Sequence, residues 1–364
     1  FPYTTLFRSR DFAGLFKNLV NDISCSAFLF SATIEALVRT LFPRRNPSTK
    51  QLTVHLAGGL GNQLFQVAAG IYFAKDRDIF LEPGIAFPRK NSKDEPEVMD
   101  FILPSSIYLD VNRKYHYFTH RITNFLLRIS GNARYSQINS IYPVANRVGE
   151  FFLNRYLGRK VKLLISKGIG FSNALDSSSE SIYLLGLFQS YKWLEDENVM
   201  KKMFSISPVF ESDEFLDLKE LALLEKPLVV HVRLGDYKKE NNFGILSTDY
   251  YRRALKIHNK ISDFSSIWVF TNEKVLAQEI FPHEFANQVR WVAMEELSSA
   301  QTLELMRYGS SYVIGNSTFS WWAATLSYTA SPAVVAPEPW FKSTESPSGL
   351  VPKNWISIPS TFRK

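Results

Sequence analysis

The residues best suited to chemistry lie in three short segments, each of which follows an apolar run. One of them, His231-Val232-Arg233-Leu234-Gly235-Asp236-Tyr237, lies at the end of an apolar run that begins at Leu228. Alternate side chains of a strand share a face, so His231 and Arg233 are expected on the same side. A guanidinium there can hold a diphosphate through two hydrogen bonds and stabilise the charge that develops on a leaving nucleotide. The alternative is an Arg233–Asp236 ion pair that only locks the turn.

A glycine turn forms the second segment, Gly58-Gly59-Leu60-Gly61-Asn62-Gln63. It lies between an apolar run over 52–57 and an apolar pattern of helical spacing from Leu64 to Tyr72. Glycines let the backbone approach a ligand closely, and a helix amino terminus offers N–H groups to an anion. The glycine spacing differs from the dinucleotide fingerprint, and no acidic partner follows at the expected distance. A simple tight turn, with Asn62 as the helix cap, is the alternative.

The third segment, Gly315-Asn316-Ser317-Thr318-Phe319-Ser320-Trp321-Trp322, carries small hydroxyl side chains between a predicted strand and a predicted helix. Ser317 or Thr318 at the helix amino terminus can bind a phosphate through its hydroxyl and through backbone N–H groups. The alternative is an ordinary helix cap. For Trp321 and Trp322 we favour packing in the core over a direct function.

The elements that must position these segments are clearest after residue 227. Apolar runs predict strands over 228–232, 267–271, 289–292, 312–314 and 334–336, and helical patterns predict helices over 250–259, 300–308 and 319–327. Strands that alternate with helices predict a parallel, doubly wound sheet, whose ligands bind outside the carboxyl ends of the strands. Earlier in the chain we predict a strand over 52–57, a strand with its exit over 184–190, helices near 117–129 and 212–224, and otherwise loops between 76 and 182. No helix is expected in the Pro- and Trp-rich segment from Pro337.

Three regions are predicted from these patterns. Residues 1–49 form an extension, 50–226 a first domain, and 227–364 a second α/β domain whose C-terminal tail packs back. The second boundary rests on Lys226-Pro227, because proline restricts the residue before it. In the extension, Phe1–Arg10 resemble translated sequencing-adapter sequence, and no secretory pattern is present. The rest of it is expected to be a helix pair or disordered. A membrane-surface helix, with Arg39, Arg44 and Arg45 beside Leu41 and Phe42, is the alternative.

The composition excludes several classes of protein. Of the 364 residues, 45% are hydrophobic and 21% charged, values that exclude a mainly disordered or collagen-like chain. One cysteine, Cys25, excludes an intrachain disulfide and a zinc site built from cysteines, and it fits a reducing compartment. The net charge of +7 favours an anionic partner, but no nucleic-acid-binding signature is present. Asp76, Asp78 and Glu82 are not suitably placed for a metal-binding Asp-x-Asp motif.

Four motifs in one order, Gly58–Gln66, Gly186–Trp193, His231–Tyr237 and Gly315–Ala323, resemble the bacterial α-1,2-fucosyltransferases of glycosyltransferase family 11. The resemblance runs from about Leu52 to Trp355. It implies an α/β, GT-B-like fold of two Rossmann-type halves with the donor site in the C-terminal half. Residues 50–226 would then be a Rossmann-like acceptor domain, and 227–364 a Rossmann-like GDP-sugar-binding domain. It also implies GDP-L-fucose as donor, a galactose-containing glycan as acceptor, inversion at the anomeric carbon, and no metal or other cofactor.

The resemblance also implies roles for single residues. Arg233 matches the arginine that holds the donor diphosphate, and His231 matches a histidine near the ribose or guanine. Asn316, Ser317 and Thr318 fall in the segment that contacts phosphate. Asn62, with Gly58, Gly59 and Gly61, matches a turn that faces the reaction centre in related fucosyltransferases.

Two departures from the family pattern affect the donor site. Leu234 stands where the family usually has a second arginine, and Asn272-Glu273 stand where it usually has Ser-Asp. The guanine edge is therefore expected to be recognised by Glu273 or by Asn272. Asp236 is the nearest carboxylate that could take the proton of the acceptor hydroxyl, with a structural role as its alternative.

The expected place of action is the cytoplasm, with peripheral contact to the inner membrane face and a lipid-linked acceptor used in surface polysaccharide synthesis. A fucosyltransferase of another linkage, or a transferase for another GDP-sugar, is the nearest alternative. A nucleotide-binding protein without transfer activity would keep Arg233 and lack the acceptor cleft.

Overall fold

The computed structural model describes residues 50–75, 77–83, 96–109, 147–151, 153–154, 160–166, 169–171, 181–208, 212–235, 237, 243–262, 264–294, 297–343, 346–347 and 349–363. The predicted extension over 1–49, the predicted helix near 117–129 and the base candidate Asp236 lie outside these residues. No helix in the described ranges is long and apolar enough to cross a membrane.

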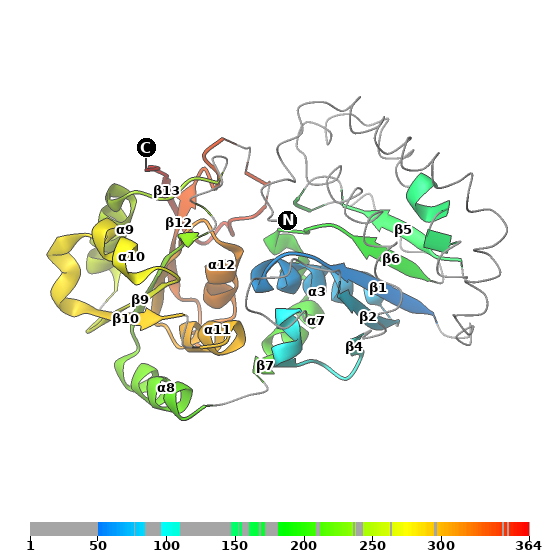
Figure 1. Ribbon diagram of the computed structural model, residues 1–364, viewed down its shortest axis with the longest axis horizontal. Helices are drawn as coiled ribbons and strands as arrows, with labels where there is room; N and C mark the ends of the chain where they lie inside the picture. Colours follow the sequence, from blue (N-terminus) through cyan, green and yellow to red (C-terminus); the bar gives the residue numbers. More distant parts are fainter. Residues whose placement is uncertain are drawn as a thin grey trace.

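The described chain forms two parallel sheets that lie side by side (Figure 1). The first has the strand order β4-β2-β1-β6-β5 and the second the order β10-β9-β8-β11-β12-β13. The strands of the first sheet are β1 (Gln51–Leu56), β2 (Asp78–Pro83), β4 (Ile107–Leu109), β5 (Lys162–Ile165) and β6 (Ile182–Leu185). Those of the second are β8 (Leu228–Val232), β9 (Ile267–Thr271), β10 (Val289–Ala293), β11 (Ser311–Val313), β12 (Ala333–Glu338) and β13 (Ile356–Pro359).

The second sheet has the strand order of the dinucleotide-binding Rossmann fold. Counted along the chain, its strands lie in the order 3-2-1-4-5-6, and the direction of winding changes between β8 and β11. The first sheet begins with the same 3-2-1 arrangement and is parallel throughout. The prediction of an α/β, GT-B-like fold with two Rossmann-type halves is therefore confirmed.

The helices cover the faces of these sheets and fill the space between them (Figure 1). They are α3 (Leu60–Ala74), α7 (Glu197–Phe204), α8 (Asp213–Glu225), α9 (Thr248–Ile261), α10 (Lys274–Ile280), α11 (Ser299–Arg307) and α12 (Thr318–Thr325). Short 3-10 turns are η2 (Glu97–Asp100), η4 (Tyr191–Glu195) and η6 (His283–Gln288), and β3 (Phe101–Ile102) pairs antiparallel with β7 (Ser207–Pro208).

The strands and helices predicted for the second half are present, and they follow one another in the predicted order. The strands over 228–232 and 267–271 have the predicted bounds, because both are apolar runs buried on two faces. β13 is the strand that the prediction missed. It ends at Pro359, and it lies at the edge of the sheet where a proline is tolerated.

The predictions for the first half need correction. The expectation of loops between 76 and 182 is wrong, because β2, β4 and β5 lie there. The strand predicted over 184–190 is β6, which ends at Leu185, so the chain has already left the sheet at Gly186. α8 ends at Glu225, whose carboxylate accepts a hydrogen bond from the indole Nε1 of Trp268 in the second half, at 2.6 Å. The domain boundary at Lys226 stays a prediction.

The two halves share a continuous hydrophobic core where α3 meets α12. The ring of Phe65 on α3 lies 4.5 Å from that of Trp321 and 4.9 Å from that of Trp322, measured between centroids. Both tryptophans are fully buried, which confirms the core role predicted for them. The indole Nε1 of Trp321 also donates to the carbonyl oxygen of Leu350, so the C-terminal tail is attached to the same junction.

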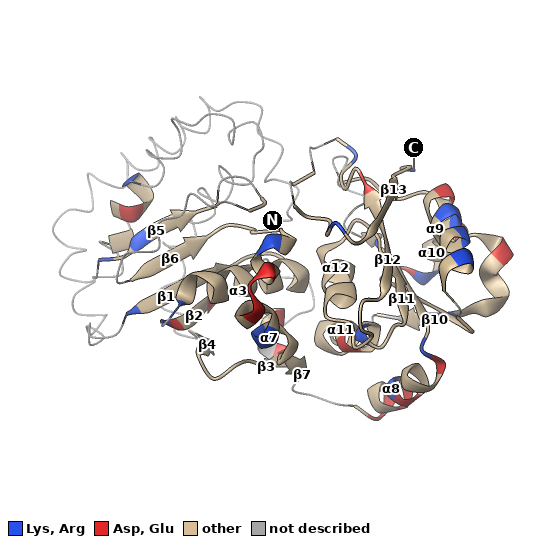
Figure 2. Cartoon of the chain, turned by 180° about the vertical axis from the view of Figure 1, so that it is seen from behind, with Lys and Arg blue, Asp and Glu red and all other residues tan. Residues whose placement is uncertain are grey.

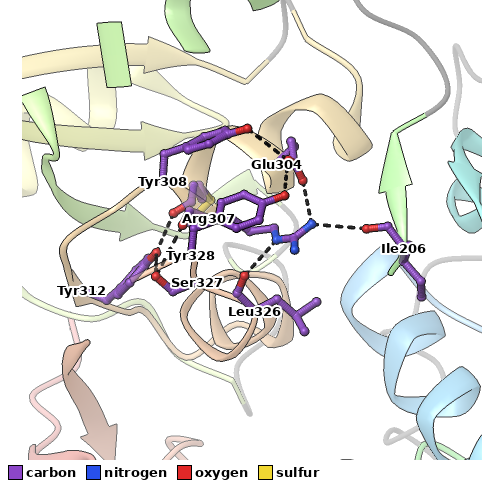
Figure 3. A network of polar contacts seen from close by, with 9 residues as sticks. Ile206, Glu304, Arg307, Tyr308, Tyr312, Leu326, Ser327 and Tyr328 are labelled. Carbon is purple, nitrogen blue, oxygen red and sulfur yellow. Dashed lines mark hydrogen bonds and ion pairs between the residues drawn. The ribbon is translucent and has the colours of Figure 1, made fainter. Parts of the chain in front are cut away.

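A buried ion pair reinforces this junction near the end of α11 (Figure 3). The Arg307 guanidinium pairs with the Glu304 carboxylate at 2.7 Å, and the two side chains are 2% and 7% exposed. Arg307 also donates to the carbonyl oxygens of Leu326, at 2.8 Å, and of Ile206, at 3.2 Å. Ile206 belongs to the segment that leaves the first half. The arginine therefore joins the two halves through the backbone.

Candidate functional site

The carboxyl ends of β8 and β11 bring two of the three predicted segments together. These neighbouring strands deliver His231–Arg233 and Gly315–Ser317 to the point where the winding of the sheet reverses. Ligands of open α/β sheets bind in the crevice outside this point. Tyr250 and Tyr251 of α9 fix the strand ends, since their hydroxyls donate to the carbonyl oxygens of Ile314 and His231 at 2.7 and 3.2 Å.

Arg233 is half-buried at this edge and is connected to the β11 segment by an aromatic bridge. Its guanidinium carbon lies 5.5 Å from the centre of the Tyr237 ring. The Tyr237 hydroxyl donates to the carbonyl oxygen of Asn316, one residue before Ser317, at 2.9 Å. The bridge holds the arginine near the amino terminus of α12, as a clamp for a diphosphate requires.

His231 lies beneath this edge and is fully buried. Its ring packs against Phe319 at 6.0 Å between centroids, and among the described residues neither ring nitrogen has a hydrogen-bond partner. Burial, and to a smaller extent the charge of Arg233, lowers the pKa of His231 to about 3. The imidazole is therefore neutral at physiological pH, and a contact with ribose or guanine stays a prediction for it.

Asn272 and Glu273 follow β9, the strand next to β8. The Asn272 side-chain oxygen accepts a hydrogen bond from the backbone N–H of Leu234 at 3.2 Å. Asn272 thus supports the turn that carries Arg233, a role that the sequence did not suggest. Glu273 precedes α10 and is half-buried, and recognition of the guanine edge by either side chain stays a prediction.

Asn316 and Ser317 also have structural partners. Both amide hydrogens of Asn316 are used, because its Nδ2 donates to the carbonyl oxygens of Phe243 and Gly244 at 3.1 Å each. An anionic sugar nucleotide at this edge would therefore contact the backbone of Asn316, because the side-chain nitrogen is already used. Ser317 is the cap of α12, since its hydroxyl accepts from the backbone N–H of Phe319 at 3.3 Å. The cap predicted as an alternative is confirmed, and it leaves the Ser317 hydroxyl hydrogen to be donated elsewhere.

The glycine turn is held by two buried glutamines of α3. Gln66 accepts from the backbone N–H of Ala57 and donates to the carbonyl oxygen of Gly186, both at 2.9 Å. Gln63 donates to the carbonyl oxygen of Gly58 at 2.8 Å. Gly58 has φ of 83°, a conformation that side chains disfavour. These hydrogen bonds therefore fix the glycine turn at the point where β1, β6 and α3 meet.

Gly61 allows α3 and α12 to meet at their amino termini. A Cβ atom on Gly61 would lie 2.5 Å from the backbone carbon of Thr318 and 2.6 Å from the backbone nitrogen of Phe319. Any larger residue would push the two helices apart. The glycine turn of the first half is thus placed directly against the hydroxyl segment of the second.

Asn62 lies at this contact, and the alternative that it caps α3 is wrong. Gly59 is at the cap position without a side-chain bond, and the Asn62 oxygen instead accepts from Gln189 Nε2 at 2.8 Å and Thr318 Oγ1 at 3.3 Å. The amino terminus of α3 is bound by the Glu97 carboxylate, which accepts from the backbone N–H of Leu60. The other oxygen of Glu97 accepts from Ser299 Oγ of α11 at 2.7 Å, which ties the halves together again.

The structure therefore gathers Arg233, His231, Asn316, Ser317 and Thr318 at one sheet edge and brings Asn62 to them. The residues that support them had no predicted role; they are Tyr237, Gln63, Gln66, Glu97 and Gln189. Four of these, all except Glu97, lie inside the four motifs, and that position was a usable signal. Among the described residues, no group of three or more His, Cys, Asp or Glu side chains could hold a metal ion.

This arrangement can bind an anionic group between a guanidinium and a helix amino terminus, beside the contact between the two α/β halves. The chemistry that would fit it is the departure of a diphosphate, because a guanidinium and a helix amino terminus both favour negative charge.

Comparison with known proteins agrees with this chemistry. The model of the family described as Glycosyl transferase family 11 matches residues 174–358, just over half of the chain. The O-antigen biosynthesis glycosyltransferase WbnK of Escherichia coli is 26% identical over 327 residues, covering 83% of this chain and 99% of the relative. An alpha-1,2-colitosyltransferase of Escherichia coli is 24% identical over 317 residues, covering 84% and 98%.

Among solved structures, the fucosyltransferase NodZ from Bradyrhizobium is 14% identical, with a TM-score of 0.44 over 82% of this chain and all of that one. The matched family region contains the motifs that begin at Gly186, His231 and Gly315 and the strands of the second sheet up to Ile358 of β13. The chain belongs to glycosyl transferase family 11.

Proposed function

We propose that this glycosyltransferase moves L-fucose from GDP-L-fucose to the 2-hydroxyl of a galactose in a surface polysaccharide such as O-antigen, with inversion at the anomeric carbon. The observation that carries the proposal is the position of Arg233 beside the amino terminus of α12, at the switch point of the second sheet. The donor and linkage are supported by the motifs that resemble α-1,2-fucosyltransferases. Of the two relatives, one is an O-antigen biosynthesis glycosyltransferase and the other an alpha-1,2-colitosyltransferase, which supports the same polymer class and linkage.

The mechanism follows from where charge develops. Cleavage of the bond between fucose and phosphate leaves an oxocarbenium-like sugar and a GDP leaving group. Arg233 and the first turn of α12 stabilise the negative charge on that group, and a single contact of this kind is typically worth about 3–4 kcal/mol. The acceptor hydroxyl attacks from the side of the first half and must lose its proton to a base. We propose Asp236 for this role because it follows Arg233 by three residues.

A second candidate is the transfer of another sugar from its GDP derivative. The observation that favours it is the departure at Asn272-Glu273, together with the relative named as a colitosyltransferase. Both candidates use the same diphosphate clamp and differ only in the sugar.

The test is transfer by the purified protein, with a panel of nucleotide sugars offered against a panel of β-galactosides and the products analysed by mass spectrometry. We expect a mass gain of one deoxyhexose with GDP-fucose and a galactoside, and NMR of that product should show an α-1,2 linkage. Transfer from a UDP- or CMP-sugar in preference to every GDP-sugar would contradict the proposal.

We expect this activity to persist in excess EDTA. Arg233 and the amino terminus of α12 supply the positive charge that a divalent metal supplies in metal-dependent transferases. The initial rate with GDP-fucose should be the same with and without the chelator. A rate that EDTA abolishes and that manganese or magnesium restores would show that the diphosphate is bound differently.

We also propose that the enzyme acts in the cytoplasm and meets a lipid-linked acceptor at the membrane. Figure 2 marks several positions along α9 as lysine or arginine. Lys256 and Lys260 of this helix are exposed. Basic residues near an anionic surface contribute up to about 1 kcal/mol each. Flotation with anionic liposomes at low salt tests this contact, and a protein that stays at the bottom of the gradient would exclude it.

A further inference from the structure

Two adjacent tyrosines of α9, Tyr250 and Tyr251, donate hydrogen bonds to the second sheet at places where its own hydrogen-bond ladders end. Both side chains are buried, at 0% and 2% exposed. Burial raises the pKa of each hydroxyl, so both stay protonated and can donate. The acceptors are backbone carbonyl oxygens, that of Ile314 at 2.7 Å and that of His231 at 3.2 Å. One helix thus contacts both β8 and β11 at their carboxyl ends.

The ladder between β11 and β12 ends because of a proline. The backbone N–H of Ile314 donates to the carbonyl oxygen of Val335 on β12 at 3.0 Å. In a regular parallel ladder, the carbonyl oxygen of Ile314 would then accept from the residue two positions after Val335, which is Pro337. Proline has no N–H to donate. The Tyr250 hydroxyl therefore takes the place of a ladder bond that β12 cannot make.

The ladder on the other side of β11, toward β8, ends in the same region. β8 stays paired with β9 as far as Val232, but its pairing with β11 ends at Val230. The carbonyl oxygen of His231 faces Gly315, since a Cβ atom on that glycine would lie 3.0 Å from it. The same Cβ atom would lie 3.7 Å from the Tyr251 hydroxyl. Tyr251 therefore binds β8 beside the point where the chain leaves β11, and Gly315 leaves room for the bond.

The two contacts act on the segments that carry the proposed diphosphate site. The carbonyl groups involved come two residues before Arg233 and three before Ser317, the cap of α12. We propose that Tyr250 and Tyr251 are positioning residues that fix the distance and orientation between Arg233 and the amino terminus of α12. The inference rests on the proposed function, because that function places the diphosphate between these two features. A group bound from two sides is held tightly only when both sides are correctly spaced.

A third side chain of α9 provides a matched control. His258 is fully buried, and its Nε2 is 2.9 Å from the carbonyl oxygen of Tyr312. Burial lowers the pKa of His258, so the ring is neutral, and Nε2 carries the hydrogen because a carbonyl oxygen can only accept. Tyr312 lies inside the paired part of β11. Loss of this bond should therefore weaken the same contact between helix and sheet without moving the strand ends.

Three substitutions test the proposal. Tyr250→Phe and Tyr251→Phe each remove one hydroxyl and keep the ring, and His258→Leu removes the control bond. Each takes a hydrogen bond from a buried carbonyl oxygen, so all three should lower the midpoint of urea unfolding. In the two tyrosine variants we also expect the Kd for GDP, measured by titration calorimetry, to rise about fivefold or more. In His258→Leu the Kd should stay within about twofold of wild type.

A double-mutant cycle with Arg233 separates positioning from a general loosening of the fold. If Tyr251 acts by placing Arg233 opposite α12, its hydroxyl has nothing left to place once the guanidinium is absent. The rise in Kd caused by Tyr251→Phe should therefore shrink to within about twofold in the Arg233→Ala background. A rise as large in that background as in wild type would overturn the positioning role.

Failure of this inference and failure of the proposed function give different results. If the wild type transfers from a GDP-sugar but the tyrosine variants bind GDP as tightly as wild type, or no more weakly than His258→Leu, only the positioning role is overturned. A wild type that binds no GDP would overturn the proposed function and this inference with it. If neither tyrosine variant folds, as shown by its thermal melt, Gly315→Ala decides, because its Cβ atom would displace the His231 carbonyl group. An unchanged Kd in Gly315→Ala would then overturn the role.

Discussion

Arg233→Ala is expected to remove most transferase activity and to leave the fold intact. The guanidinium is half-buried at the end of β8, stacked on Tyr237 outside the hydrophobic core, so its loss creates no cavity there. What is lost is a charge-assisted contact to the departing diphosphate, worth roughly 2–4 kcal/mol in the transition state. The kcat/KM for GDP-fucose should fall by the corresponding factor of about 30 to 1000.

Arg233→Lys should fail nearly as badly, because an ammonium is a point charge and cannot make two parallel bonds to the diphosphate. Arg252→Ala is the matched control, since this arginine lies on α9 in a surface ion pair with Glu284. Steady-state kinetics and a thermal melt on all three variants give the comparison. If either substitution at Arg233 leaves kcat/KM near the wild-type value, the guanidinium does not hold the diphosphate.

Arg307→Met is expected to give the largest loss of stability. The substitution leaves the Glu304 carboxylate buried without its cation, and breaking a buried pair from one side typically costs about 3–5 kcal/mol. It also removes the bond to the carbonyl oxygen of Leu326 within the second half and the bond to the carbonyl oxygen of Ile206, which crosses between the halves. Urea unfolding should show the loss as a lower midpoint of the transition.

A second substitution, at Glu304, tests whether the unpaired buried charge causes the loss of stability in Arg307→Met. Tyr328 donates its hydroxyl hydrogen to Glu304 at 2.6 Å, and burial, followed by this hydrogen bond, raises the pKa of Tyr328, so the hydroxyl stays protonated. Because removal of both partners of a buried pair is often tolerated, the double variant Arg307→Met with Glu304→Leu should be more stable than Arg307→Met alone. Arg253→Met, which breaks the exposed pair with Asp249, should cost less than about 1 kcal/mol. A midpoint of Arg307→Met equal to that of Arg253→Met would mean that the buried pair contributes nothing.

The second half could be predicted from the sequence because its signals are local. β8 and β9 are unbroken apolar runs, and α9 places Tyr250, Tyr251, Ala254, Leu255 and His258 on one buried face. The first half lacks such signals. β2 carries two acidic residues, Asp78 and Glu82. Glu82 is buried, and the hydroxyl of Tyr183, 101 residues later in the chain, donates to its carboxylate at 2.7 Å. No pattern of neighbouring residues predicts such a contact.

Only part of the candidate site could be predicted from the sequence. Arg233 follows a predicted strand, and Ser317 and Thr318 begin a predicted helix after another. Their position at one edge could therefore be predicted, because the carboxyl ends of parallel strands lie together. The position of Asn62 could not be derived locally, because its partners Gln189 and Thr318 lie 127 and 256 residues away along the chain. A capping role was the local expectation for Asn62, and the long-range contacts replaced it.

The most direct test of the central claim is a crystal structure of the protein with GDP. We expect the diphosphate at the carboxyl edge of the second sheet, within hydrogen-bond distance of the Arg233 guanidinium and of the first turn of α12, with its terminal phosphate directed toward Asn62. GDP bound in the first half, or a diphosphate that touches neither Arg233 nor α12, would contradict the account.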